Sequence, residues 1–233
     1  MANRYKWLLI VAGIAVVALS TWYYSGLTKQ TKDIEGVAEY DSIAPKMPYK
    51  KIPLQAFRHV VINCDLGPVK VYFEADEKPQ IEIHHTFIKY VEMSYRGDTL
   101  VIHSFKTPKS SKENPINRQM YIHTPVVKSY TGEATQTFFS NFSAPYMKID
   151  SRSSYIRLNA CEIEQLDLTT NKSCNYMIGS DCAFDRVNAK INPSSAMTIL
   201  GYVESEFFLT ANNLQNIRFG ENIRKFRMSK YKK

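Results

Sequence analysis

Glycine and cysteine are both scarce in this chain of 233 residues, and their scarcity removes several classes of function. With only 9 glycines, the sequence has no glycine-rich loop of the kind that cradles phosphates, and it has neither a nucleophile elbow nor a zinc-protease helix. The 4 cysteines, Cys64, Cys161, Cys174 and Cys182, include no C-x-x-C pair. A disulfide framework and a structural zinc site are therefore not expected, and we predict no cofactor and no catalytic residues.

Acidic residues are nearly absent from the C-terminal end, where seven basic side chains face only Glu221. They are Arg218, Arg224, Lys225, Arg227, Lys230, Lys232 and Lys233, and they contribute much of the formal net charge of +8. Blocks of like charge are usually solvated. We therefore predict that residues 229–233 form a basic tail and that nucleic acid is not a partner.

An uncharged stretch at the start of the chain has a clear hydrophobic character. No charged residue occurs between Trp7 and Thr28, and Arg4 and Lys6 precede this stretch. About 20 apolar residues are enough to cross a bilayer core, and basic residues favour the cytoplasmic side. We predict a transmembrane helix at residues 7–24, within a membrane or signal segment at 1–24, and hence a single-pass inner-membrane protein of the bacterial cell envelope. The alternative is a signal peptide cleaved near Ser20, which would also place the following domain outside the cytoplasm.

The rest of the chain favours strands over helices. Hydrophobic residues make up 44% and aromatic residues 12%, which is enough to bury a core and suits pleated surfaces. Residues 25–55 are polar, carry three prolines and are predicted to be a tether. An all-β domain is predicted at 56–228, and its strand-rich start at 56–127 contains six runs that alternate apolar with polar residues. These runs are 59–63, 69–73, 80–84, 90–95, 99–103 and 119–123.

A period of 20 to 21 residues runs through the second half of the domain, about 145–226. Apolar residues recur in four aligned columns, two of which are Ile156, Tyr176, Met197, Ile217 and Leu158, Ile178, Ile199, Phe219. Stacked coils of one short repeat would bring such residues above one another. The sequence therefore predicts a right-handed single-stranded β-solenoid with about 20–21 residues per coil.

A column of asparagines and a column of cysteines share this period. Asn171, Asn192 and Asn213 are spaced 21 apart, so we predict a structural ladder of stacked amides at a recurring turn. Cys161 and Cys182 fall in an apolar column, and we expect small buried side chains there rather than a disulfide.

Several segments also resemble a known family in their order. Phe57-Arg-His-Val-Val-Ile, Gly67-Pro-Val-Lys-Val-Tyr, Arg96-Gly-Asp-Thr-Leu-Val-Ile and Met120-Tyr-Ile-His-Thr-Pro lead into coils of about 20 residues. This layout resembles the auto-transporter adhesin, head GIN domain family of bacterial envelope proteins, over roughly residues 55 to 228. The turns depart from that family's Gly-Ser-Gly pattern, as at Asn192-Pro-Ser-Ser. The resemblance implies an exported β-solenoid and brings no catalytic residues.

Two features are candidates for chemistry or binding. His84, His103 and His123 each follow an isoleucine and are spaced 19 and 20 apart, so they could line one face as metal ligands, although a row of outward polar residues is the preferred interpretation. The segment from Ser129 to Ser143 carries three phenylalanines and is predicted to cap the open end of the core rather than to form a binding loop.

These observations favour a non-enzymatic, envelope-anchored binding or scaffold domain, adhesin-like, that displays a sheet face to a protein or glycan partner. Besides this partner, contact with a membrane is predicted through residues 7–24. The alternative function is an enzyme acting on cell-surface or extracellular polysaccharide. Asp150 and Asp167 occupy outward positions of adjacent coils, but nothing in the sequence orients an acid and a base there. A concave cleft with converging carboxylates would distinguish the enzyme from the binding domain.

Overall fold

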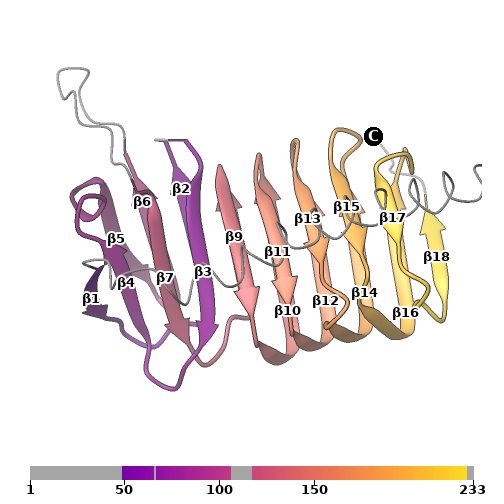
Figure 1. The fold of residues 1–233 in the computed structure, drawn as a ribbon, viewed down its shortest axis with the longest axis horizontal. Helices are drawn as coiled ribbons and strands as arrows, with labels where there is room; N and C mark the ends of the chain where they lie inside the picture. The colour runs from indigo at the N-terminus through magenta and orange to yellow at the C-terminus, as the bar shows by residue number, and fades with distance from the viewer. Residues whose placement is uncertain (1–48, 66, 106–116, 230–233) are drawn as a thin grey trace, which may run out of the picture. The chain divides into compact units, whose positions relative to one another are not determined.

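The structure, a computed structural model, describes residues 49–65, 67–105 and 117–229. These residues form two nine-stranded sheets that lie face to face (Figure 1). In spatial order, the first sheet contains β1 (Tyr49–Pro53), β4 (Gln80–His84), β7 (Gln119–Thr124), β3 (Val69–Ala75), β9 (Thr135–Ser140), β11 (Tyr155–Asn159), β13 (Asn175–Ile178), β15 (Ala196–Ile199) and β17 (Ile217–Phe219).

The second sheet runs beside the first. It contains β18 (Phe226–Ser229), β16 (Tyr202–Ala211), β14 (Ala183–Ile191), β12 (Glu162–Thr170), β10 (Ser143–Arg152), β8 (Ser129–Glu133), β2 (His59–Cys64), β6 (Thr99–Ser104) and β5 (Val91–Arg96). A short 3-10 helix, η1 (Ile88–Tyr90), precedes β5. The all-β prediction is therefore confirmed, and so are the six runs predicted as strands between residues 59 and 123.

The repeat of 20 to 21 residues sets the register in which the parallel strands pair. Ile156 pairs with Tyr176, Tyr176 with Met197, and Met197 with Ile217. The column of Leu158, Ile178, Ile199 and Phe219 is paired in the same order. The columns predicted from the sequence are thus neighbouring positions on successive strands, because equal spacing along the chain places equivalent residues in register.

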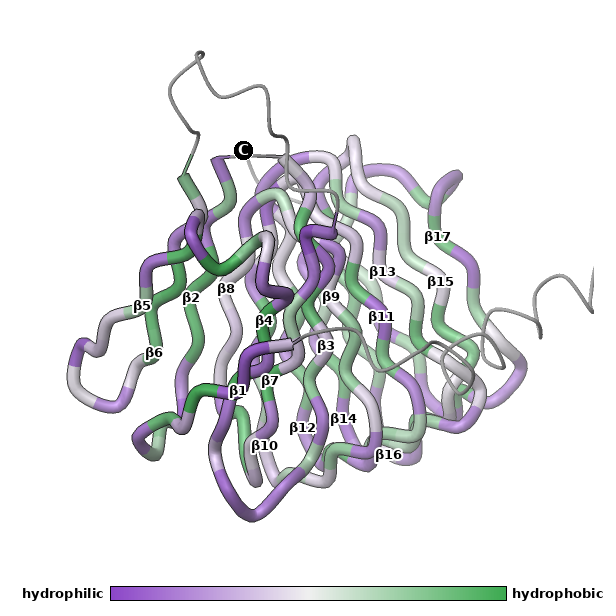
Figure 2. The backbone as a smooth tube through the Cα atoms, turned by 60° about the vertical axis from the view of Figure 1, so that its left-hand side comes forward, coloured by the Kyte–Doolittle hydropathy of each residue, from purple (hydrophilic) through white to green (hydrophobic). Residues whose placement is uncertain are grey.

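The core lies between the two sheets. Residues alternate between buried and outward positions along most strands. In β2, Val60, Ile62 and Cys64 are buried and the residues between them are partly exposed. Hydrophobic and hydrophilic residues alternate accordingly along the tube in Figure 2. Aromatic side chains fill the centre: Phe73, Tyr130 and Phe139 are fully buried and contact one another, with ring centroids 4.6 to 5.6 Å apart. Each such side chain contributes roughly 1.5–3 kcal/mol on burial.

The prediction of a right-handed single-stranded β-solenoid is wrong. The strands form two sheets of nine, and the pairing is mixed, since β1–β4, β4–β7 and β5–β6 are antiparallel. At the end of the sheets that contains β1 and β5, the spatial order of the strands differs from their order in the chain. β7 lies between β4 and β3, and β2 lies between β8 and β6. A constant period reveals which residues are lateral neighbours, but it cannot reveal insertions in strand order or the reversal of a strand.

The predicted transmembrane helix at residues 7–24 lies outside the described residues. Within the described ranges, no helix is long and apolar enough to cross a membrane. The prediction of a single-pass inner-membrane protein, with its domain outside the cytoplasm, is corrected on this finding.

Two further segments differ from expectation. Tyr49–Pro53, within the predicted tether, forms the edge strand β1. The segment from Ser129 to Ser143 forms β8, β9 and the start of β10. The prediction that it caps the core is wrong, because β9 is the middle strand of the first sheet and Phe139 and Phe142 are buried within the core.

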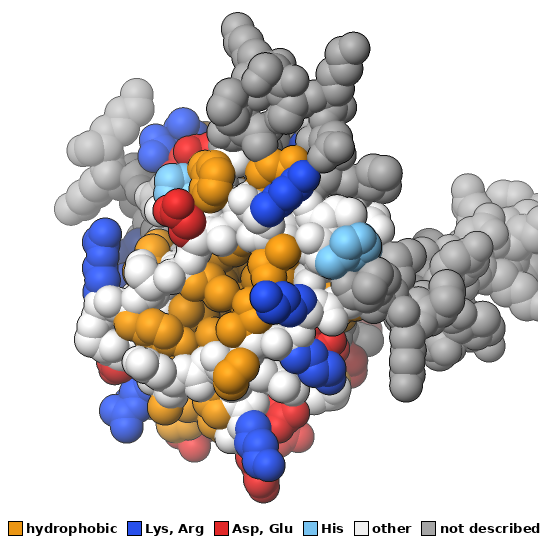
Figure 3. All heavy atoms as spheres, turned by 90° about the vertical axis from the view of Figure 1, so that its left-hand side faces the viewer, with side chains coloured by type: hydrophobic (Ala, Val, Ile, Leu, Met, Phe, Trp, Pro, Cys, Tyr) orange, Lys and Arg blue, Asp and Glu red, His pale blue; other side chains and the backbone are white. Residues whose placement is uncertain are grey.

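At the β1 and β5 end, the core-facing side chains of Ile52, Val91 and Met93 are only partly buried. Hydrophobic side chains gather on this end of the molecule (Figure 3).

Candidate functional site

The three histidines proposed as metal ligands are not brought together. His84 and His123 lie on β4 and β7 of the first sheet, where His123 pairs with Gln80 rather than with His84, and His103 lies on β6 of the second sheet. Among the described residues, no group of three or more His, Cys, Asp or Glu side chains is arranged to hold a metal ion.

Each histidine has partners of its own instead. His123 lies between two carboxylates, with Nδ1 3.4 Å from Glu74 Oε2 and Nε2 3.6 Å from Glu82 Oε1. His103 Nε2 is 3.0 Å from Asp65 Oδ2. His84 Nδ1 is 2.8 Å from the Thr86 hydroxyl, and its pKa is lowered by burial and by the neighbouring His85. Each histidine thus contacts its own neighbours, while Nε2 of His123 is buried and makes no hydrogen bond among the described residues.

The predicted asparagine ladder takes a different form. Asn192 Oδ1 accepts hydrogen bonds from the backbone and hydroxyl of Ser194, at 3.1 and 2.9 Å. Asn213 Oδ1 accepts one from the backbone of Gln215 at 2.9 Å. Asn192 and Asn213 therefore stabilise their own turns, as Asx turns do.

All four cysteines are buried as thiols. Burial raises the pKa of Cys64 to about 11. A hydrogen bond between the thiols of Cys161 and Cys182 lowers the pKa of the first and raises that of the second.

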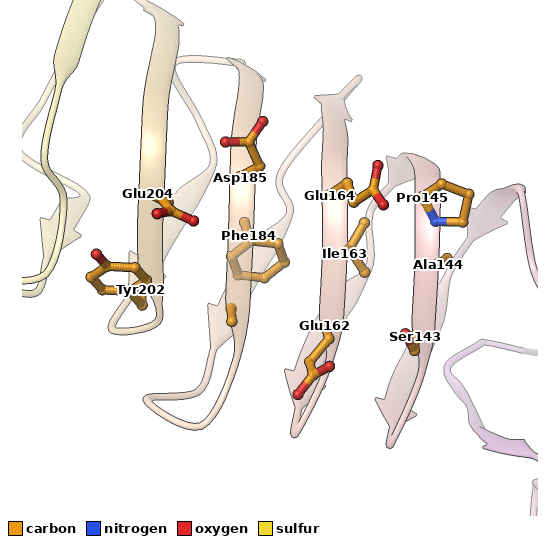
Figure 4. A pocket seen from close by; sticks show the side chains of 11 residues that line it. Ser143, Ala144, Pro145, Glu162, Ile163, Glu164, Phe184, Asp185, Tyr202 and Glu204 are labelled. Carbon is orange, nitrogen blue, oxygen red and sulfur yellow. The ribbon is translucent and has the colours of Figure 1, made fainter.

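A groove on the second sheet carries several charged groups. It has a volume of about 430 Å³ and crosses β10, β12, β14 and β16 near their first residues (Figure 4). Its lining comprises Ser143, Ala144, Pro145, Glu162, Ile163, Glu164, Ala183, Phe184, Asp185, Tyr202 and Glu204. We call it the acidic groove, after its four carboxylates.

The groove arises from a bend that recurs in all four strands. Strict alternation fails just after the first buried residue: β12 turns both Glu164 and Gln165 outward, and β14 does the same with Asp185 and Arg186. A register shift follows between β14 and β16 at Phe184 and Arg186. Extra outward residues bend a strand, as β-bulges do. Repeating the bend on adjacent strands produces a continuous depression.

The floor of the acidic groove is apolar and its rim is charged. The apolar groups that a ligand could contact belong to Pro145 and Ala183, which are exposed, whereas Ile163 and Phe184 are buried, 1% and 3% exposed. Figure 4 shows Ile163 between the side chains of Glu162 and Glu164, and the carboxylates of Glu164 and Asp185 on neighbouring strands. Such a floor can cover the aliphatic part of a ligand while the rim contacts its polar groups.

Cations of the chain itself already contact two of the four carboxylates. Asp185 accepts a hydrogen bond from the Ser205 hydroxyl and lies 3.7 Å from Arg186 Nε. Glu204 Oε1 is 3.9 Å from Arg224 Nη1. Glu162 and Glu164 are exposed, and no ion pair engages either of them among the described residues. These two glutamates are therefore available to a ligand.

This arrangement suits cation binding better than acid–base catalysis. A general acid is normally a carboxyl kept protonated by burial or by a second carboxylate close to it, whereas the groove's glutamates are solvated. Asp150 and Asp167 are also engaged elsewhere: Asp150 pairs with Lys148 at 3.0 Å, and Asp167 accepts bonds from Tyr146 and Asn188 at 2.9 and 2.8 Å. Burial and Asp167 together raise the pKa of Tyr146 to about 12.

Sequence reasoning missed the acidic groove. Its signal was present in the breaks of alternation, namely Pro145-Tyr146, Glu164-Gln165 and Asp185-Arg186, each following a buried apolar residue. These breaks are spaced 19 and 21 residues apart, close to the period of the core columns, so a bent and outward-facing feature could have been inferred from them.

A row of aromatic side chains lies on the outer face of the first sheet. Tyr121, Tyr72 and Phe138 are partners on β7, β3 and β9, and neighbouring rings stack with centroids 4.8 Å apart. Because each ring covers the face of the next, the flat faces of the row are occupied by one another. We call these three residues the aromatic row.

Comparisons with known proteins show the fold. No protein-family model and no curated protein sequence matches the chain. A solved structure of a “putative adhesin” from Bacteroides fragilis has a TM-score of 0.53 at 9% identity, covering 81% of this chain and 98% of that chain. A “putative adhesin” from Parabacteroides merdae has a TM-score of 0.46 at 14% identity, covering 81% and 98%.

A “putative lipid binding protein” from Parabacteroides distasonis has a TM-score of 0.40 at 12% identity, covering 79% of this chain and 97% of that chain. Of these three structures, the Bacteroides fragilis structure is close enough to show a shared architecture. The chain thus has a fold that also occurs in a protein described as a “putative adhesin”, while the GIN domain resemblance stays a prediction.

Proposed function

We propose that this domain is a non-enzymatic binding module whose acidic groove binds a protein segment bearing lysine or arginine side chains. The observation that carries the proposal is the placement of four carboxylates around an apolar floor in a chain whose formal net charge is +8. Because the chain as a whole is positively charged, a group of four carboxylates creates a local region of negative electrostatic potential.

The chemistry of the groove matches a basic side chain in both of its parts. The methylene stem of a lysine or arginine can lie on the exposed Pro145 and Ala183, and its charged head can reach Glu162 or Glu164, since such side chains bury their stems and keep their heads near water. The repeat of carboxylates on adjacent strands suits an extended segment that presents several cations in succession.

A neutral glycan fits the same surface less well. Sugar recognition commonly uses exposed flat faces of aromatic rings, but Arg224 lies over the ring of Tyr202 at 5.8 Å from its centroid. The aromatic row offers ring edges rather than faces, because its rings stack on one another. The name of the Bacteroides fragilis protein agrees with a binding role but does not identify a ligand.

The test measures binding of synthetic peptides by titration calorimetry. The probe is a ten-residue peptide alternating lysine and valine, and the matched probe alternates lysine and serine. The double variant Glu162→Gln, Glu164→Gln should weaken binding of the first peptide by about three- to tenfold, since exposed ion pairs contribute about 0.2–1 kcal/mol each. The lysine–serine peptide should bind more weakly to the unmodified chain, because it cannot use the apolar floor.

The control is the double variant Glu77→Gln, Glu92→Gln, which makes the same change in charge at exposed positions outside the groove. If both double variants weaken binding equally, the interaction is with the overall field and the groove is not the site. If a neutral glycan binds saturably and this binding is lost in the variant Glu162→Gln, Glu164→Gln, the ligand of the groove is a glycan rather than a basic protein segment. Hydrolysis of that glycan would overturn the non-enzymatic role.

A further inference from the structure

Large hydrophobic side chains that are more than a third exposed occur mainly toward the C-terminal end of the described residues. Six of the seven, each 36–44% exposed, lie between residues 200 and 228. Three of them belong to the last strands of the two sheets: Phe219 of β17 is 37% exposed, and Phe226 and Met228 of β18 are 44% and 42% exposed.

These three side chains point toward the core side of their sheets. Phe219 pairs with Ile199, Phe226 with Phe207 and Met228 with Leu209, and all three partners are buried. Phe207, Phe219 and Phe226 also contact one another, with ring centroids 5.0 to 5.6 Å apart. They are therefore core residues that lack a following layer, rather than surface residues that happen to be apolar.

Both sheets end in an open edge at the same place. β17 pairs only with β15, and β18 pairs only with β16, among the described strands. An edge strand presents unpaired backbone N–H and C=O groups that can pair with another strand. The end therefore offers two open ladders with an uncovered apolar layer between them, and we call it the open end.

We infer that the open end docks on the open end of a second copy of this chain, as a twofold dimer. A covering partner must present two strands at the separation of the two sheets, with apolar side chains between them, and the same end of another copy meets that requirement. A twofold axis perpendicular to the sheets would pair β17 with its counterpart and β18 with its counterpart, antiparallel in both cases. Both sheets would then be continuous across the dimer, as in isologous interfaces.

The charges of the open end permit this contact. Three of its cations already face acids of β16: Arg227 Nε is 2.8 Å from Glu206 Oε1, Lys225 Nζ is 3.9 Å from the same atom, and Arg224 pairs with Glu204. Like charges from two copies would repel if they were uncompensated. Pairing within each copy reduces that repulsion, so the apolar layer can decide the association.

The test measures the molar mass of the full chain by light scattering and sedimentation over roughly a hundredfold range of concentration. By mass action, the fraction of dimer should rise with the concentration of the chain. We expect twice the monomer mass, which falls to the monomer mass in Phe226→Asp and in Met228→Asp. The matched control is Tyr146→Asp, which places the same charge at a position elsewhere on the second sheet that is 37% exposed. It also removes the hydrogen bond to Asp167, but it should leave the dimer intact.

A second measurement does not depend on the folding of a variant. Hydrogen exchange of the unmodified chain at high and low concentration should show that the β18 amides that do not bond to β16 are protected only in the dimer. A monomer at all concentrations would overturn the proposal, and so would assemblies larger than a dimer. A dimer that persists in both aspartate variants would assign the association to another part of the chain, such as its apolar N-terminal run.

Discussion

Tyr72 of β3 lies face to face with Phe138 of β9, with ring centroids 4.8 Å apart and ring planes 12° from parallel. The two residues are direct partners in the parallel register, and both point away from the core. On its other side, Tyr72 stacks on Tyr121 with the same separation. Cross-strand aromatic pairs stabilise a sheet through the area they remove from water and through ring stacking, so the aromatic row reinforces the first sheet where parallel β3 and β9 meet.

We expect this pair to show a measurable coupling. Tyr72→Ala and Phe138→Ala should each lower the free energy of unfolding, and the double variant should lower it by less than the sum, with a coupling of about 0.5–1.5 kcal/mol. Urea unfolding of the four proteins in the double-mutant cycle measures it. Strictly additive effects would show that the stacked geometry contributes nothing beyond the individual contacts of each ring.

A buried hydroxyl provides a second prediction. Tyr130 is fully buried, and its hydroxyl is 2.9 and 2.6 Å from the hydroxyls of Thr135 and Thr137. Tyr130→Phe leaves two buried threonine hydroxyls without this partner and should cost about 1–3 kcal/mol. Tyr202→Phe removes a hydroxyl at a position that is 36% exposed and should cost far less. Equal losses of stability in the two variants would contradict the role of the buried network.

Much of this fold could be predicted from the sequence, and the limits were physical. Alternation and the column of Leu158, Ile178 and Ile199 predicted strands and their lateral neighbours, because side-chain period and register follow directly from strand geometry. The position of β7 between β4 and β3 could not be predicted, because strand order depends on packing between distant segments. The acidic groove was missed because the columns record buried positions, whereas a break such as Glu164-Gln165 lies among outward ones.

Alkaline pH should destabilise the domain through a buried thiol. Burial raises the pKa of Cys64 from 9.0 to about 11. Because the folded-state pKa lies above the unfolded one, the contribution to stability is complete below pH 9 and is lost as pH rises through about 11. The free energy of unfolding should therefore fall by about 2 kcal/mol over this range on account of this group, as measured by urea unfolding at several pH values.

The variant Cys64→Ala isolates the contribution of this thiol. Its stability should be lower at neutral pH, because a buried side chain is truncated, but it should decline less steeply between pH 9 and 11. The pKa of Tyr130 is also raised by burial, so some alkaline loss should remain in the variant. If the two proteins lose stability in parallel, ionisation of Cys64 is not linked to unfolding.

The salt dependence of binding should separate the contribution of the carboxylates of the acidic groove from that of its apolar floor. Attraction between exposed charges is screened over about 10 Å at 0.1 M ionic strength and about 3 Å at 1 M, whereas contact with the exposed Pro145 and Ala183 depends on apolar area and is strengthened by salts such as sulfate. Binding of the lysine–valine peptide should therefore weaken as sodium chloride rises and then level off at a residual affinity. The lysine–serine peptide should lose its binding almost completely, because it has no apolar contact to retain.

The comparison is made by calorimetry at matched salt, and the variant Glu162→Gln, Glu164→Gln should show a shallower salt dependence with the same residual affinity. A steep salt dependence that is unchanged in this variant would place the interaction outside the groove.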